Sequence, residues 1–238
     1  MNIEKLYIIG SKFRDFSNGK NVITYEDFLN FSSKNLNSHS TIIIGQGVSF
    51  EKVKNIKRCL SNLNPKHSFL ILENSSLKVE KNRVHKKFDR NVFISNLIRV
   101  NKNSFTAHLA VDDGCDEMSD HQSGAHVQGM LLVEAARQMC MACTDFIVDK
   151  ATERMGFVLK NQRVTFKNFV FPVDVSIFLE FNAIDITAKT GIASINFVQF
   201  DRVCCEVTWE WKGAKQDVLR TMEQYNVKKA ISQLTKIN

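Results

Sequence analysis

The chain has 238 residues, of which 44% are hydrophobic, enough to bury the core of one large domain or two small ones. No run of about 18 apolar residues is present, so we expect no membrane span. The opening residues MNIEKLYIIG contain too short an apolar run for the core of a signal peptide. Six cysteines without an export signal then predict reduced thiols and a cytoplasmic protein.

The net charge of +7 is concentrated in the first part of the chain. Residues 1–90 hold 16 Lys and Arg against 8 Asp and Glu, whereas the remainder is close to neutral. A basic surface attracts acidic partners of any kind, or is simply solvated. No zinc-finger spacing or aromatic-interleaved basic motif indicates nucleic-acid binding.

Residues 1–80 have the pattern of a small α/β domain. The apolar runs LYIIG, TIIIG and FLIL predict strands at 6–10, 41–45 and 69–72. Apolar residues at helical spacing predict a helix from Phe50 to Leu63, with Ser49 as its N-cap. Strand, helix and strand with short connections indicate a parallel βαβ unit. Between the second strand and the helix, GQG at 45–47 is a tight turn or a phosphate site.

Residues 81–214 show a different order of predicted helices and strands. Two strands within 91–111 precede a long apolar helix, from about Gly129 to Asp149. Four strands follow, at 163–171, where a shift of phase suggests a bulge, and at 175–183, 191–200 and 203–211. Alternation in the last strand places Val203, Cys205 and Val207 on one face, with Cys204 on the other. Residues 215–238 predict a polar amphipathic helix.

The long helix is apolar on nearly every side, so it must be covered all round. An antiparallel sheet wrapped round one central helix satisfies this order of elements. We therefore predict an α+β chain, with a single hotdog fold preceded by a small α/β unit of the βαβ type.

One polar stripe interrupts that helix. Glu134, Arg137 and Gln138 lie at i, i+3 and i+4, on one side. An internal ion pair between Glu134 and Arg137 that fixes the helix to the sheet would explain the stripe. The alternative is a catalytic carboxylate, because His121 and His126 come just before the helix.

Gly129 opens the helix and permits close approach of the backbone to a ligand. The free N–H groups at a helix start favour a polarised carbonyl oxygen. An imidazole, a buried carboxylate and these donors together indicate carbonyl or thioester chemistry.

The stretch DHQSGAHVQGMLLVEAARQ resembles the active-site segment of the 3-hydroxyacyl-carrier-protein dehydratases, which share the hotdog fold. More closely, VHK at 84–86, HVQGM at 126–130 and EAARQ at 134–138 resemble the A-factor biosynthesis hotdog family over residues 84–212. The resemblance implies an acyl transferase that joins a β-ketoacyl group from acyl carrier protein to dihydroxyacetone phosphate. Typical members carry two hotdog repeats and this chain has one, so we expect a homodimer.

On this reading His121 is the general base and Glu134 the acid, base or orienting carboxylate. The remaining candidate substrate-binding residues are His126, Gly129, Arg137, Gln138 and His85. The acyl group would arrive on the phosphopantetheine arm of acyl carrier protein or CoA, with no further cofactor. Dehydration or hydrolysis on the same fold, or a non-catalytic acyl-binding subunit, are the alternatives.

Two other patterns have simpler explanations. Cys140 and Cys143 fall on the buried helix and pack in the core, so no metal site is expected. The acidic loop at 112–120 matches no calcium loop and is expected to be solvated.

Overall fold

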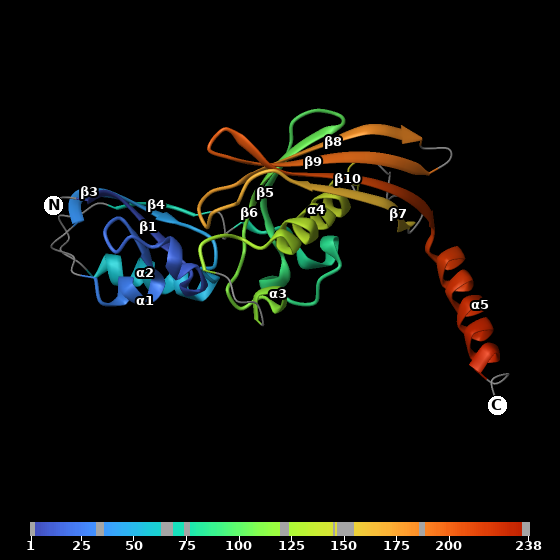
Figure 1. Cartoon of the computed structure of the whole chain (residues 1–238), viewed down its shortest axis with the longest axis horizontal. Coiled ribbons are helices and arrows are strands. Elements are labelled where there is room, and N and C mark those ends of the chain that lie inside the picture. The colour runs from blue at the N-terminus through green and yellow to red at the C-terminus, as the bar shows by residue number, and fades with distance from the viewer. Residues whose placement is uncertain are drawn as a thin grey trace.

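The computed structural model describes residues 3–31, 36–62, 69–73, 77–119, 124–144, 146, 155–185 and 189–234. These ranges form two sheets, one parallel and one antiparallel, followed by a helix that extends away from both (Figure 1). The predicted catalytic residue His121 lies outside the described residues.

The N-terminal unit is a four-stranded parallel sheet in the order β2-β1-β3-β4. Its elements in chain order are β1 (Ile3–Ile9), the 3-10 helix η1 (Ser11–Phe16), β2 (Val22–Thr24), α1 (Tyr25–Leu29), β3 (Leu36–Ile44), α2 (Phe50–Ser61) and β4 (Leu70–Leu72). The three predicted strands and the predicted helix are present. Strand β2 and helix α1 were not predicted from the sequence.

Local caps explain why both helices start where they do. The Ser49 side chain accepts from the backbone N–H of Lys52, as predicted for the start of α2. Thr24 and Asp27 form a reciprocal capping box at α1. The apolar side chains of both helices pack against β1 and β3 to form a small core.

The second unit is a six-stranded antiparallel sheet in the order β5-β6-β8-β9-β10-β7. Its strands are β5 (Ile94–Arg99), β6 (Ser104–Leu109), β7 (Met155–Phe166), β8 (Ser176–Asp185), β9 (Thr190–Gln199) and β10 (Arg202–Lys215). Helix α4 (Gly129–Thr144) lies along its inner face (Figure 1). The short helices η4 (Lys81–Val84), η5 (Asp89–Asn91) and α3 (Asp116–Ser119) lie beside it. This is the predicted hotdog fold.

The core consists of apolar side chains from alternate strand residues, which point to the inner face of the sheet. Val175, Ile177, Leu179 and Phe181 are all buried, as predicted for one face of β8. They pack with β9, β10 and α4 in one cluster, which also contains Cys140 and Cys143. Both thiols therefore serve as core side chains.

Two sequence expectations about the strands need correction. Strand β7 begins at Met155 and ends at Phe166, and its irregularity lies opposite Glu210, outside the predicted segment 163–171. Cys204 is buried, because a register shift between Val203 and Cys205 breaks the alternation.

Helix α4 is not covered all round, since Met130 in its first turn is 68% exposed. Its helical residues end at Thr144, and most of the predicted continuation to Asp149 lies outside the described residues.

The GQG turn joins the two units. The Gln46 side chain is buried, and its Nε2 donates to the backbone oxygens of Leu109 (2.9 Å) and Val173 (3.2 Å). Its Oε1 accepts from the backbone N–H of Val111 (2.8 Å). The backbone N–H groups of residues 45, 46 and 47 donate to Ile8, Pro172 and Val111. No donor of this turn is left for a phosphate, so the tight-turn alternative is the correct one.

The last helix, α5 (Gln216–Leu234), follows β10 directly and buries none of its residues. It points away from the sheet (Figure 1). No helix among the described residues is long and apolar enough to cross a membrane.

The junction at Gln46 supplies a stability test. Substitution Gln46→Ala leaves a buried N–H and two buried carbonyls without partners, and should cost about 2–4 kcal/mol of unfolding free energy. The matched control Gln224→Ala, on exposed helix α5, should change it by less than about 0.5 kcal/mol. Urea denaturation of the whole chain measures both, and equal costs would contradict this account of the junction.

Candidate active site

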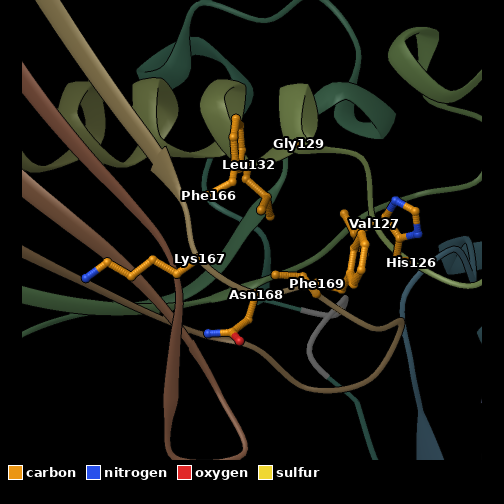
Figure 2. A pocket seen from close by; sticks show the side chains of 9 residues that line it. His126, Val127, Gly129, Leu132, Phe166, Lys167, Asn168 and Phe169 are labelled. Carbon is orange, nitrogen blue, oxygen red and sulfur yellow. The ribbon is translucent and has the colours of Figure 1, made fainter.

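A cavity of about 550 Å³ opens at the N-terminal end of α4 (Figure 2). It lies between the loop before α4 and the segment that follows β7. Its lining residues are His126, Val127, Gly129, Leu132, Phe166, Lys167, Asn168, Phe169 and Val170. The wall is mainly apolar, with one imidazole, one amide and one ammonium group, a composition that suits an apolar ligand with a polar end.

Three local contacts shape this cavity. The backbone N–H of Val127 donates to the carbonyl of Val170 (2.7 Å), which ties the loop before α4 to the segment after β7. The Asn168 side chain donates to the carbonyl of Val203 (2.9 Å). A Cβ on Gly129 would lie 2.8 Å from the Phe166 ring, so only glycine permits this approach.

His126 is the imidazole on this wall. Its ring lies against Phe169, with centroids 4.7 Å apart and planes inclined by 49° (Figure 2). Within the described part of the chain, neither ring nitrogen has a hydrogen-bond partner. The ring is therefore held by a tilted contact with Phe169, and no described residue occupies its nitrogens.

The start of α4 supplies the electrostatic character of the cavity. The first N–H groups of a helix lack partners within the helix, and they carry the positive end of its dipole. Gly129 is in this first turn and on the cavity wall. A carbonyl or oxyanion oxygen placed at this end would meet favourable donors.

Glu134 occupies a separate cluster. Its carboxylate accepts from Arg137 Nε (2.8 Å) and Nη2 (2.7 Å) and from Gln138 Nε2 (3.0 Å). Lys86 Nζ lies 3.0 Å from the same carboxylate and also donates to Glu117 (3.2 Å). The carboxylate is thus bound by two cations and an amide.

This cluster connects the two sequence motifs, VHK and EAARQ. Arg137 also donates to the carbonyl of Val84 (3.1 Å). The Gln138 side chain is fully buried, accepts from the backbone N–H of Phe93 (2.7 Å) and donates to the carbonyl of Asn91 (2.8 Å). Helix α4 is therefore fastened to the segment 84–93, which leads into β5.

Glu134 and the cavity lie on different sides of α4. Glu134 follows Gly129 by five residues and Leu132 by two, which places its side chain about 140° and about 160° round the helix from theirs. Burial disfavours the charged form of Glu134, but the bonds from Arg137 and Gln138 outweigh it and lower its pKa. The carboxylate therefore stays ionised at neutral pH.

The structure places most of the predicted residues in two groups. His126 and Gly129 meet at the cavity, and the stripe from Glu134 to Gln138 meets Lys86. His85 is exposed, with a left-handed backbone (φ 54°), and belongs to neither group. Sequence reasoning missed Lys86, which stands inside the quoted VHK motif, and the segment 166–170, which has no motif.

The acidic loop is neutralised by nearby basic side chains. Three ion pairs account for most of its charge: Asp113 with Lys52, Asp116 with Arg90, and Glu117 with Lys86. Asp120 lies outside the described residues. Among those described, no group of three or more His, Cys, Asp or Glu side chains could hold a metal ion.

The pH dependence of stability tests the cluster. Lys86→Met should cost about 1–3 kcal/mol of unfolding free energy at pH 7, while exposed Lys102→Met should cost less than about 0.5 kcal/mol. A carboxyl with a lowered folded pKa stabilises above its ordinary pKa of 4.5 and loses that contribution as pH falls through the folded value. The cost of Lys86→Met, measured by urea denaturation, should therefore shrink below pH 4.5, and a pH-independent cost would contradict the pairing.

Among solved structures, the chain is similar to a mutant thioesterase from Pseudomonas aeruginosa, with 15% identity, coverage of 51% of this chain and 81% of that one, and a TM-score of 0.42. It is also similar to a thioesterase from Haemophilus influenzae, with 11% identity, 51% and 78% coverage, and a TM-score of 0.41. These likenesses are too distant to indicate a function.

No curated protein matches the chain. The family model described as "AfsA: A-factor biosynthesis hotdog domain" matches residues 72–213, more than half of the sequence. This match covers the antiparallel sheet except the last two residues of β10, and it includes helix α4 and both motifs of the Glu134 cluster. The chain belongs to the A-factor biosynthesis hotdog domain family.

Proposed function

We propose that this protein is an enzyme that transfers an acyl group from a thioester, carried by acyl carrier protein or CoA, to an acceptor hydroxyl. Membership of the A-factor biosynthesis hotdog family supports the substrate class. The observation that carries the proposal is the cavity at the start of α4. It combines a mainly apolar wall, an imidazole whose nitrogens bond to no described residue, and a helix start, which are groups that suit an acyl thioester.

The acyl chain would lie against Leu132, Phe166 and Phe169, with its thioester carbonyl toward the first turn of α4. The acceptor hydroxyl attacks that carbonyl and loses its proton to an imidazole. The negative charge that develops on the carbonyl oxygen is stabilised at the helix start. Collapse of the tetrahedral intermediate breaks the C–S bond, and the thiolate takes the proton back from the imidazole.

Two histidines are assigned to this step. We propose His121 as the general base, and His126 as a residue that contacts the substrate. His126 is five residues further along the chain and lies on the cavity wall. We assign no substrate role to His85, because it is exposed and away from the cavity.

Glu134 enters the proposal as an orienting carboxylate. Lys86 and Arg137 keep its carboxylate ionised, and it lies on the side of α4 that faces away from the cavity. It is therefore poorly suited to donate a proton to the substrate. Arg137 and Gln138 hold Glu134 and the segment 84–93 and so fix the direction of α4. The helix start then remains aimed at the cavity.

We also propose that the protein is a homodimer. Strand β7 is 12 residues long and lies at an edge of the sheet, where β10 is its one partner among the described strands. Val158, Leu159 and Phe166 on this strand are exposed apolar residues. A long apolar edge strand favours pairing with another copy of itself about a two-fold axis.

Incubation with acyl-carrier-protein and CoA thioesters, with and without dihydroxyacetone phosphate, tests the function. Intact-mass analysis should show acceptor-dependent loss of the acyl group from the carrier. Acceptor-independent loss would instead indicate hydrolysis, and loss of water would indicate dehydration. No change with any thioester would favour a non-catalytic acyl-binding subunit and contradict the proposal.

The assigned residues give a second readout in the same assay. His121→Ala should lower the rate constant by about 10²–10⁴-fold, because it removes the base. His126→Ala should raise KM more than it lowers kcat. The control His39→Ala changes an exposed histidine of β3 and should leave both values unchanged. Full activity of His121→Ala would refute its assignment.

A further inference from the structure

Beyond its base, helix α5 packs against no other helix or strand that the structure describes, although it carries several apolar side chains. All of its residues are at least partly exposed, and Leu219 at its base touches the chain at Gly156 of β7. In proteins, most of the stability of a helix comes from packing of its apolar face rather than from the helix alone. Its apolar residues therefore indicate a surface that another molecule covers.

The first half of α5 presents one apolar stripe. Val218, Met222 and Tyr225 lie within about 60° of each other round the helix, at about 100° per residue. Their exposed fractions are 48%, 56% and 67%. Val227 and Ile231, further along, lie on the opposite side of the helix, about 180° and 220° from Val218.

A second apolar surface surrounds the mouth of the cavity at the start of α4. Phe166 and Phe169, which line this cavity, are exposed by 55% and 67%. Phe166 is the last residue of β7, and its ring touches Gly129. Two large exposed apolar side chains on a cavity wall indicate a wall that is incomplete in the single chain.

The register of the edge strand relates these two surfaces. Lys215 is paired with Met155, so α5 begins beside the first residue of β7. Two copies of β7 that pair along their whole length about a two-fold axis run antiparallel, and in that register the first residue of one strand lies beside the last residue of the other. The base of α5 therefore lies beside Phe166 of the second copy, at the mouth of that copy's cavity.

The two α5 helices do not meet in such a dimer. The 12 residues of β7 span about 40 Å, and one helix rises at each end of the paired strands. The body of the partner, rather than its α5, is the surface within reach.

We propose that α5 of a second copy closes the cavity at the start of α4, with Val218, Met222 and Tyr225 packed on Phe166 and Phe169. This proposal rests on the proposed homodimer and extends it, because each acyl site is then built from both copies. The stripe of α5 becomes the outer wall that the acyl chain meets, so the length and bulk of the accepted chain depend on residues of the partner.

A photo-crosslinking amino acid at position 222 of the full chain tests this arrangement without any substrate. Irradiation should give a covalent dimer of two 27.2 kDa chains, and peptide mapping should place the bond in residues 126–130 or 166–170 of the second copy. The same probe at position 227, on the opposite side of α5, should give at least about tenfold less of that product. Cross-links confined to one chain, or equal yields from both positions, would overturn the proposal.

An edge-strand variant provides the control for the dimer. Leu159→Lys on β7 should give a monomer in sedimentation and abolish the cross-link, while Ile98→Lys on the opposite edge strand, β5, should leave both unchanged. A native chain that is monomeric but transfers acyl groups would overturn this inference and leave the proposed function intact. A cross-linked dimer that is inert toward every thioester would support this inference and contradict the proposed function.

Discussion

The carboxylate of Glu134 lies between Lys86 and Arg137, and this half-buried ion-paired cluster joins α4 to the segment that leads into β5. The buried amide of Gln138 completes the connection through the backbone of residues 91 and 93. A charge in a partly desolvated place is tolerated only when it is paired and hydrogen-bonded, so all members of the cluster depend on each other. Their common effect is to fix the rotation of α4, and with it the side of the helix that meets the cavity.

Once α4 is fixed, its first turn defines the site. Gly129 lets the Phe166 ring approach the backbone, and the paired loops around it hold His126 beside Phe169. The N-terminal unit contributes by a different route. The carboxyl ends of parallel strands are a common ligand site in α/β sheets, but here that edge is joined to the antiparallel sheet through Gln46. The candidate site residues therefore lie in the hotdog unit, and the N-terminal unit packs against it through Gln46.

Much of the fold was predictable, because alternation and helical spacing report burial directly. The predicted face of β8 and the N-cap at Ser49 were both confirmed. Strand β2 and helix α1 are too short to show a period, and the bulge beside Cys204 breaks the alternation that was expected of β10. The site was predictable only in part. The helix stripe, His126 and Lys86 stand in or beside recognisable motifs, although no local pattern shows that Lys86 pairs with Glu134. Residues 166–170 reach the cavity through tertiary contacts that no local pattern encodes. The domain boundary near residue 80 and the role of His121 stay predictions.

The most direct test is a crystal structure with a non-hydrolysable acyl-pantetheine analogue, which locates the carbonyl of the ligand. The account predicts the carbonyl oxygen within hydrogen-bond distance of an N–H group in the first turn of α4, with the acyl chain against Leu132 and Phe166 and the Glu134 ion pairs intact. An analogue bound on the other side of α4, with its carbonyl at Glu134 and the pairs to Lys86 and Arg137 broken, would contradict it.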